Sequence, residues 1–551
     1  MINVQEIDGL LLREMVIAGA TLLEQKREMV DALNVFPVPD GDTGTNMSLT
    51  MSSATREVNT KEFTRADEAA AALAKGALRG ARGNSGVITS QLFRGFSKAL
   101  AGVEKITPVQ FAEALKRGAE TAYKAVMKPK EGTILTVARV IAEDAIKQAE
   151  MAPNDYDALF RVILTTGEEI LKRTQEMLPA LKQAGVVDAG GKGLLLIYTG
   201  YAAVLRGEKI PDLTDESAGE VEDNSFKDDH DAIRNLNNIY HAAFRITELP
   251  EDVGEAEVVM LRRQMNRVGD RVNIEQTEGN IIVHVHTNEP DKALQYALDL
   301  GEIVDVEIIN IQAVRREAER AAEAEKKKNE PAKPYGMVSV SLGSGFSALL
   351  KDMSVDEIVE GGQTMNPSIE DISNAIDRIN AESVFVFPNN GNIILAAQQA
   401  AAMCTDKKVY VLPTKNVAMG IAAVVAFVPD MDAESNIAAM TEAAERVRTG
   451  MITYAVRDSE FENLHIQQGD IIGLSNGAVT FKSDSVHDVA ILLTESIVTD
   501  DDALITIYYG ADTSAEEAEA LAAEIQEKYP DCEVEAREGG QPLYYYLIAV
   551  E

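Results

Sequence analysis

The first 205 residues carry apolar side chains at the three- and four-residue spacing of amphipathic helices. The stretch from Ile7 to Leu33 is long and amphipathic, and alternating runs of β-branched residues are scarce in this region. Further helical patterns cover roughly 65–79, 86–101, 108–127, 134–149, 154–176 and 191–205. Apolar residues at this spacing are typical of helices that bury one face. The pattern therefore predicts an all-α domain over residues 1–205.

Glycine-rich breaks separate the predicted helices of this first domain. The breaks have the sequences PDGDTGTN, RGARGNSG, PKEGT and DAGGKG. Glycine and proline commonly end helices and form turns. Three of them, PDGDTGTN, RGARGNSG and DAGGKG, are more than chain reversal needs, so these three are candidate ligand loops.

The pattern changes after residue 205. Residues 206–235 are strongly acidic, which predicts a solvated linker. Residues 236–314 alternate between strand and helix, with a turn at Glu278–Gly279–Asn280. The predicted strands are 238–246, 270–276, 280–287 and 303–311, and the predicted helices are 251–267 and 290–300. The order βαββαβ predicts a ferredoxin-like α+β middle domain.

A second charged segment, residues 315–334, predicts another linker before a third domain over 335–551. Strand patterns such as GMVSVSL, SVFVFPN, KVYVLPT and ALITIYYG alternate with helical patterns there, as in α/β domains. Residues 361–368, 388–390 and 453–458 fall at expected strand ends, where open α/β sheets place ligand crevices. Three domains also agree with a chain of 551 residues, which is too long for one core.

The composition narrows the classes of partner. The formal net charge is −37, so nucleic acid and anionic membrane surfaces would repel the chain. No stretch approaches about 18 uncharged apolar residues, and the first residues do not resemble a signal peptide. Cys404 and Cys532 are the only cysteines, which suits a reducing compartment. We therefore expect a cytoplasmic protein with no stable membrane insertion and no nucleic-acid partner.

The sharpest candidate site is the segment Asn34 to Met47, NVFPVPDGDTGTNM. Asp40 and Asp42 stand two residues apart on a turn constrained by proline and glycine, so both carboxylates can converge on one Mg²⁺. The residues that follow are Thr43, Gly44, Thr45 and Asn46, whose backbone N–H groups could open a helix towards phosphate. The alternative is an ordinary Asp-Gly turn that caps the next helix, and the triplet alone favours that alternative.

Two further breaks favour a nucleotide site over simple capping. Arg82-Gly83-Asn84-Ser85-Gly86 precedes one predicted helix, and Asp188-Ala189-Gly190-Gly191-Lys192-Gly193 precedes another. Glycines permit close approach of the backbone to a nucleotide lying across such loops. Neither a P-loop nor a strand-borne dinucleotide fingerprint is present.

The middle domain offers a possible metal site. His284 and His286 stand two residues apart on one predicted strand, so they share a face. His241 lies on the first strand, which neighbours the third in a βαββαβ fold. Three imidazoles could bind Zn²⁺, or they could be ordinary polar residues of the sheet, and the residues alone weigh the two equally.

Several of these motifs together resemble a known family. PVPDGDTGTNM, ARGNSGV and GVVDAGGKGL are similar to the L-subunit domain of dihydroxyacetone kinases, a barrel of antiparallel helices that holds ATP through Mg²⁺ bound by aspartates. The full chain, with VHVHT, GGQTMNPS, FPNNGNI, TYAVRD and EGGQPLYYY, resembles the ATP-binding subunit of bacterial fatty acid kinases (FakA).

The resemblance implies roles for individual residues. Asp40 and Asp42 match metal-binding aspartates, and Asn34 is the nearest candidate for a third metal ligand. The positions that match phosphate loops are Thr45, Asn46, Asn84, Ser85 and Gly86. The positions that match the segment closing over the nucleotide are Asp188, Gly190 and Gly191. The family also pairs its HVH motif with a metal-capable residue on the first strand, which here is His241.

The resemblance also implies a function and partners. It implies ATP- and Mg²⁺-dependent phosphorylation of a fatty acid that a separate DegV-like binding protein presents, giving acyl phosphate for phospholipid synthesis. The third domain resembles the DegV fold of those carriers, and we expect it to serve docking or dimerisation in a homodimer. The alternatives are a dihydroxyacetone-type kinase, whose substrate domain is not visible in this chain, and a nucleotide-sensing, lipid-binding scaffold without turnover.

Overall fold

The structure is a computed structural model that describes residues 2, 4–35, 41–208, 238–250, 253–277, 279–311, 331–362, 365–455, 459–461, 464–475 and 478–551. Asp40, residues 456–458 and most of both predicted linkers lie outside these residues. The chain forms two compact units, one of Met1–Leu213 with Ala332–Glu551 and one of Thr214–Pro331. In the described part of the chain, no helix combines the length and the apolar character needed to cross a membrane.

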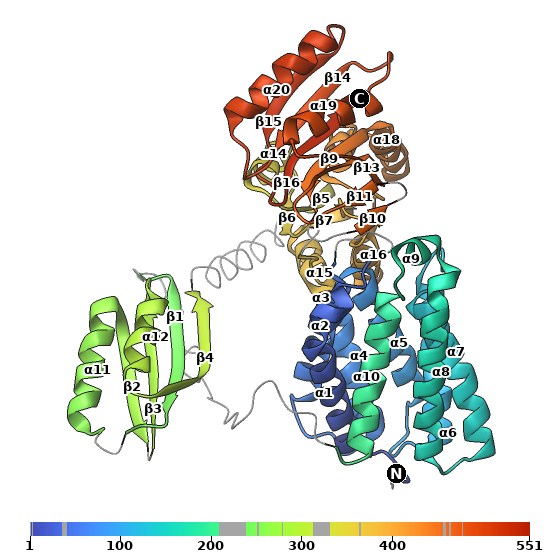
Figure 1. The fold of residues 1–551 in the computed structure, drawn as a ribbon, viewed down its shortest axis with the longest axis vertical. Helices are drawn as coiled ribbons and strands as arrows, with labels where there is room; N and C mark the ends of the chain where they lie inside the picture. The colour runs from blue at the N-terminus through green and yellow to red at the C-terminus, as the bar shows by residue number, and fades with distance from the viewer. Residues whose placement is uncertain are drawn as a thin grey trace. The chain divides into compact units, whose positions relative to one another are not determined.

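The first part of the larger unit is entirely helical in its described elements, and we call it the helical domain (Figure 1). Its helices are α1 (Gly9–Gln25), α2 (Arg27–Asp31), α3 (Thr43–Val58), α4 (Ala66–Arg79), α5 (Gly83–Ala99), α6 (Pro108–Ala125), α7 (Ile134–Met151), α8 (Tyr156–Met177), α9 (Pro179–Ala184) and α10 (Ala189–Leu205). The amphipathic stretch from Ile7 to Leu33 contains α1 and α2, which are divided at Lys26, where the backbone leaves the helical region.

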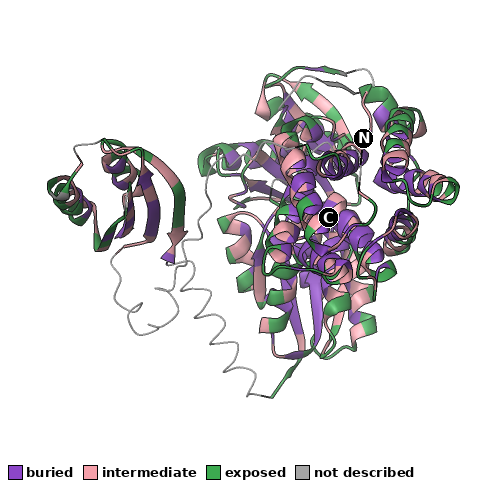
Figure 2. Ribbon diagram, turned by 90° about the horizontal axis from the view of Figure 1, so that it is seen from below, coloured by how far each residue is buried: buried purple, intermediate pink, exposed green. Residues whose placement is uncertain are grey.

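The helices of this domain pack closely because small residues lie at their crossings. A Cβ on Gly200 of α10 would lie 2.6 Å from the Cα of Gly19 of α1, so only glycine permits this contact. Phe111, Tyr156 and Phe160 form an aromatic cluster deeper in the core. Figure 2 shows the resulting pattern of inward buried and outward exposed helix faces.

The smaller unit contains one four-stranded antiparallel sheet in the order β2-β3-β1-β4. Its elements are β1 (Tyr240–Thr247), α11 (Glu255–Val268), β2 (Gly269–Thr277), β3 (Asn280–Thr287), α12 (Pro290–Leu298) and β4 (Glu302–Asn310). The element order is the predicted βαββαβ. Phe244 and Val283 face the helices in the core with Leu261 and Ala293, so the alternate strand residues face the other side of the sheet.

The last part of the larger unit, residues 332–551, is here called the C-terminal lobe, and it contains two large sheets. A parallel sheet has the order β6-β5-β7-β8, and a mixed sheet has the order β13-β12-β9-β16-β14-β15. The strands of the parallel sheet are β5 (Lys333–Ser341), β6 (Glu357–Glu360), β7 (Ala381–Phe387) and β8 (Lys408–Val411). The other strands are β9 (Arg448–Tyr454), β10 (Ser459–Phe461), β11 (Leu464–Ile466), β12 (Ile471–Ser475), β13 (Ala478–Ser483), β14 (Leu504–Tyr509), β15 (Glu533–Glu538) and β16 (Tyr544–Val550). The helices are α14 (Ser344–Asp352), α15 (Ile369–Arg378), α16 (Ile394–Met403), α17 (Val417–Val425), α18 (Ala433–Arg446), α19 (Val486–Ile497) and α20 (Ala515–Lys528).

The C-terminal lobe and the helical domain share a continuous apolar core. Ala81 and Val87 of the helical domain are fully buried in one cluster with Ile369, Ile376 and Ile393 of the lobe. The backbone N–H of Ile369 donates to the carbonyl of Ala81 at 3.1 Å. Buried apolar residues and a backbone hydrogen bond therefore join the two parts of the larger unit.

Candidate functional site

Asp42 lies at the start of helix α3 but does not cap it. It occupies the N-cap position of α3 and is 7% exposed, yet its side chain makes no capping hydrogen bond to the helix. The Asp42 carboxylate instead accepts a hydrogen bond from the side-chain amide of Asn366, with Nδ2 2.5 Å from Oδ2. The simple alternative, an aspartate that caps the next helix, therefore does not describe its side chain.

Asp31 at the end of α2 takes over the capping of α3. Its Oδ1 accepts from the backbone N–H of Thr45 at 3.0 Å, and its Oδ2 accepts from the Thr45 hydroxyl at 2.8 Å. The Asn46 N–H bonds to the Asp42 carbonyl inside the helix. Of the four N–H groups that could face phosphate, those of Thr43 and Gly44 remain, because an α-helix does not bond its first N–H groups itself.

Asn34, the candidate third ligand, lies beside this helix start. It is 2% exposed, and its Oδ1 accepts a hydrogen bond from the hydroxyl of Thr43 at 2.7 Å. The side chain thus links the segment after α2 to the first residue of α3. Its amide oxygen is engaged with Thr43, so in this arrangement Asn34 orients Thr43.

The second glycine-rich loop is held directly against α3. Gly83 has φ +57°, and a Cβ there would lie 2.5 Å from Nδ2 of Asn46. A Cβ on Gly86 would lie 2.3 Å from the hydroxyl of Thr50. Glycine at both positions therefore lets α5 approach α3, which brings Asn84 and Ser85 to the end of the domain where α3 begins.

The third loop lies at the start of α10. Asp188 is its N-cap, and Oδ2 accepts from the Gly191 N–H at 2.7 Å. Burial raises the pKa of Asp188 to about 6, while hydrogen bonds from the backbone of Gly191 and Ile134 oppose this rise. Asp188 therefore holds the starts of α10 and α7 together.

Close contacts tie the third loop to the other two. A Cβ on Gly190 would lie 3.2 Å from Cβ of Ile134, and one on Gly193 would lie 2.6 Å from the sulfur of Met47 on α3. The three glycine-rich loops that the sequence singled out thus share one end of the helical domain. Gly191 packs in the same way, because its added Cβ would lie 2.8 Å from a methyl group of Val137.

The C-terminal lobe covers this end of the helical domain. Asn366 Nδ2 also lies 3.3 Å from Oδ1 of Asn46, and the guanidinium of Arg82 donates to the Asn366 carbonyl at 2.7 Å. Asn84 donates through Nδ2 to Oδ1 of Asn392 at 2.8 Å. The predicted phosphate-loop residues Asn46 and Asn84 therefore both contact the lobe.

The side chains around Asp42 suit a hard divalent cation. The Asp42 carboxylate and the amide oxygens of Asn34, Asn46 and Asn366 are oxygen donors, which Mg²⁺ prefers. Oδ1 of Asn366 is buried and has no hydrogen-bond partner among the residues that the structure describes. An orphaned buried acceptor beside a carboxylate is consistent with a cation or its bound water at this place. The second predicted carboxylate, Asp40, lies outside the described residues.

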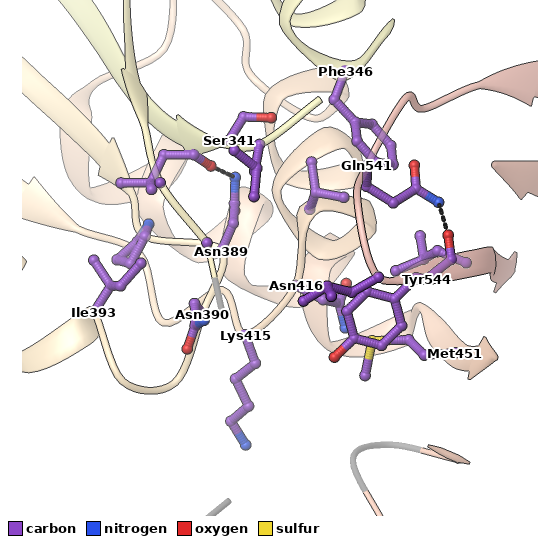
Figure 3. A pocket seen from close by; sticks show the side chains of 18 of the residues that line it. Ser341, Phe346, Asn389, Asn390, Ile393, Lys415, Asn416, Met451, Gln541 and Tyr544 are labelled. Atoms are coloured by element: carbon purple, nitrogen blue, oxygen red, sulfur yellow. Dashed lines mark hydrogen bonds between the residues drawn. The ribbon is translucent and has the colours of Figure 1, made fainter. Parts of the chain in front are cut away.

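A cavity of about 90 Å³ lies within the C-terminal lobe (Figure 3). It lies beyond the carboxyl ends of the parallel strands, between β5 and β7, where the strand order reverses. Ser341, Asn389 and Lys415 line one side, and Met451 and Tyr544 line the other. Residues 361–362 and 388–390, taken from the sequence as crevice residues, line it, whereas Thr453 does not. Pockets for drug-sized ligands are typically about 300–1,000 Å³, so this cavity is small for a long acyl chain.

The three histidines of the middle unit lie together on the sheet face opposite α11 and α12. His241 of β1 is directly opposite His286 of β3. The ring centroid of His241 lies 5.6 Å from that of His284 and 5.2 Å from that of His286. Among the described residues, however, the three imidazoles do not form a group whose ligand nitrogens all lie within 4.8 Å of one another, so the Zn²⁺ site stays a prediction. Burial and Arg271 lower the pKa of His286, which favours the neutral, metal-binding form.

Two site residues escaped the sequence analysis. Asp31 gives no motif signal because a single aspartate at a helix end is common. Asn366 lies in the segment GGQTMNPS, which the sequence placed at a strand end but not beside Asp42. Asn366 and Asp42 are separated by 324 positions, and no local sequence pattern indicates such a contact.

Three protein-family models match successive parts of the chain. The DAK2 domain model matches residues 37–203, the FakA-like middle-domain model matches 240–318, and the FakA-like C-terminal model matches 336–551. Both FakA-like models describe parts of fatty acid kinases. Protein YloV of Bacillus subtilis is 42% identical over 100% of both chains. The uncharacterized protein SAR1202 of Staphylococcus aureus is 38% identical, again over 100% of both chains.

Solved structures show more distant likenesses. The DegV family protein Cg2579 from Corynebacterium glutamicum is 14% identical, with a TM-score of 0.33, and the match covers 40% of this chain and 98% of that one. The dihydroxyacetone kinase from C. freundii in complex with AMP-PNP and Mg²⁺ is 17% identical, with a TM-score of 0.29, over 36% of this chain and 35% of that one. On the strength of the full-length relatives and the matched domain models, the chain belongs to the FakA-like family of fatty acid kinase proteins.

Proposed function

We propose that this chain transfers the γ-phosphoryl group of ATP to the carboxylate of a fatty acid, which a separate DegV-like binding protein presents, and so forms an acyl phosphate. The observation that carries the proposal is the Asp42 carboxylate, which is buried at a helix start without capping it. A buried carboxylate at such a place is suited to hold a cation against a triphosphate. Membership of a fatty acid kinase family supports the acceptor.

The residues of the helical domain supply positioning and charge stabilisation. A bound Mg²⁺ would neutralise charge on the phosphate oxygens. Asp42, with Asp40 as the second carboxylate of the motif, would hold that ion, and the N–H groups of Thr43 and Gly44 would donate to phosphate. The starts of α5 and α10, with Asn84, Ser85, Gly190 and Gly191, would border the nucleotide.

The acceptor chemistry needs no general base. A fatty acid is already a carboxylate near neutral pH, and so it is a competent nucleophile without losing a proton. The first histidine of the sequence is His230 and the first cysteine is Cys404, so the helical domain contains neither residue. Such a reaction depends on placing the carboxylate in line with the phosphoryl group.

The small cavity of the C-terminal lobe supports an external acyl carrier. At about 90 Å³ the cavity offers little room for a long acyl chain. Burial of an acyl chain is worth about 0.8 kcal/mol for each CH₂, so the acyl chain would be more stable in the apolar tunnel of a separate carrier. The lobe would then serve docking, either to the carrier or to a second copy of this chain. The histidine cluster of the middle unit would bind one structural Zn²⁺.

The test is a reconstitution followed by mass spectrometry of the products. We expect the purified chain with ATP, Mg²⁺ and free fatty acid to give little acyl phosphate, and a fatty-acid-loaded DegV-like protein to restore synthesis. Full synthesis without the carrier would place the acyl site inside this chain. ATP binding without any phosphorylated product would favour the nucleotide-sensing scaffold, and phosphorylation of dihydroxyacetone would favour the other kinase.

A further inference from the structure

Asn366 of the C-terminal lobe lies at the centre of the contact with the helical domain. It is 2% exposed, and its Nδ2 is shared between Oδ2 of Asp42 at 2.5 Å and Oδ1 of Asn46 at 3.3 Å. Both acceptors belong to the start of α3. Asn366 is distant in sequence from both acceptors, and both are predicted nucleotide-site residues. General packing of the two domains does not require so specific a hydrogen-bonding contact.

The backbone around Asn366 is fixed on both sides. Arg82 donates to the Asn366 carbonyl at 2.7 Å, and Ser368 forms a β-bridge with Arg82. Ser368 also caps α15 through a capping box with Asp371. Because Arg82 begins the second glycine-rich loop, the same contacts fix Asn366 relative to both α3 and α5.

The orientation of the Asn366 amide follows from its partners. The Asp42 carboxylate can only accept when it is ionised, so the nitrogen of Asn366 must face it. The oxygen, Oδ1, is then the atom without a hydrogen-bond partner in the described part of the chain. A buried amide oxygen in this state is costly unless a bound ligand, a water or a cation satisfies it.

We propose that Asn366 is a positioning residue of the kinase site. It holds the Asp42 carboxylate in a fixed orientation for binding Mg²⁺, and its Oδ1 would be available to the ion or to a water bound to it. The site is then composite, built from the helical domain and the C-terminal lobe. This inference rests on the proposed function in taking Asp42 as a metal ligand.

The experiment measures metal binding without fatty acid or carrier. Mn²⁺ is titrated into the full chain with the non-hydrolysable nucleotide AMP-PNP and followed by electron paramagnetic resonance. We expect Asn366→Ala to raise the Mn²⁺ dissociation constant by about 10- to 100-fold, the usual effect of losing a residue that orients a metal ligand. Gln399→Ala is the matched control, since it removes another hydrogen bond across the same interface, to Gln91 at 3.2 Å. It is expected to bind Mn²⁺ like the wild type.

A second variant separates positioning from simple packing. Asn366→Asp places a second carboxylate against Asp42, so the two repel each other unless a divalent cation lies between them. We expect Mg²⁺ to raise the thermal midpoint of this variant more than that of the wild type or Gln399→Ala. An equal Mg²⁺ response in all three proteins would show that no cation binds beside Asp42.

The outcomes are distinguishable. Equal Mn²⁺ affinity in Asn366→Ala and the wild type would overturn the inference, as would faster phosphoryl transfer with unchanged Mn²⁺ affinity, because the lobe would then merely cover the site. A wild-type protein that binds no Mn²⁺ with nucleotide would contradict the proposed function itself. A wild type that binds Mn²⁺ but makes no acyl phosphate would contradict only the proposed acceptor.

Discussion

Asp31 accepts both the backbone N–H and the hydroxyl of Thr45, at 3.0 and 2.8 Å, and thereby caps helix α3 from the end of helix α2. Two aspartates thus have different roles at the start of one helix, since Asp42 occupies the N-cap position but its side chain makes no capping hydrogen bond. Mutation should separate the structural carboxylate from the functional one.

The Asp31→Ala variant should lose stability. Replacing a side-chain cap by alanine costs about 1 kcal/mol, and the hydroxyl of Thr45 would lose its acceptor as well. Urea denaturation, followed by a spectroscopic signal of the helical domain, should give the variant a lower free energy of unfolding than the wild type. An unchanged midpoint would mean that the Asp31–Thr45 contact does not stabilise α3.

The Asp42→Asn variant should keep its stability and lose its activity. Asparagine preserves the shape and an acceptor for Asn366 but removes the charge that would hold Mg²⁺, so we expect turnover to fall by at least about 100-fold. Asp8→Asn is the matched control, because Asp8 caps α1 by accepting from Leu11 and asparagine caps equally well. Wild-type turnover in Asp42→Asn would remove Asp42 from the proposed site.

Gly86→Ala should destabilise the contact between α5 and α3. Its Cβ would lie 2.3 Å from the hydroxyl oxygen of Thr50, and overpacking of this kind costs about 1–3 kcal/mol. The cost should shrink in a Thr50→Ala background, where the opposing oxygen is absent. Gly391→Ala is the control, since no atom lies within 4 Å of its added Cβ. Equal costs in both backgrounds would rule out the clash as the cause.

The buried carboxyl group of Asp188 should make stability depend on pH. Burial raises its pKa from 3.8 to about 6, so the folded protein binds the proton more tightly than the unfolded chain does. The resulting stabilisation is fully present below about pH 4 and is lost as the pH rises through about 6, for a total of roughly 2–3 kcal/mol.

Asp188→Asn provides the comparison for this titration, because asparagine does not titrate. Denaturation of both proteins between about pH 4 and about pH 7.5, a range that spans the titration, should show the wild type losing stability relative to the variant as the pH rises. A constant difference between the two proteins across this range would contradict the raised pKa.

The histidine cluster should bind one transition metal. We expect elemental analysis of chelator-washed wild-type protein to give about one zinc per chain and His284→Ala to give much less. His487→Ala is the control, because His487 is exposed and contacts Glu524 at 2.8 Å. Metal-free wild-type protein would assign the three histidines to ordinary packing of the sheet.

Local sequence patterns were sufficient to predict most of the helices and strands. The middle unit has its strands and helices in the predicted order, since the alternation in IIVHVHT is strong and Gly279, with φ +87°, marks the turn. The amphipathic stretch predicted from Ile7 to Leu33 forms two helices, because the backbone leaves the helical region at Lys26. Helix α3 was anticipated only at its first residues.

The candidate site could be predicted only in part. Motifs located the three loops that meet at one end of the helical domain, and that meeting depends on close packing at Gly83, Gly86 and Gly193. The contribution of Asn366 depends on how the C-terminal lobe docks, which no pattern of spacing in either segment encodes. The candidate metal-binding carboxylates can be recognised in the sequence, whereas their hydrogen-bond partners can be identified only from the tertiary structure.

The separation of Asp42 and Asn366 by 324 positions has a consequence for biosynthesis. At roughly 5–20 residues per second, the ribosome needs roughly 16 to 65 seconds after adding Asp42 before it adds Asn366. During that interval Ala81 and Val87, which end up buried against the C-terminal lobe, have no lobe to cover them. In the nascent chain, the part of the apolar surface that the lobe covers in the finished protein therefore stays exposed until the lobe has been made.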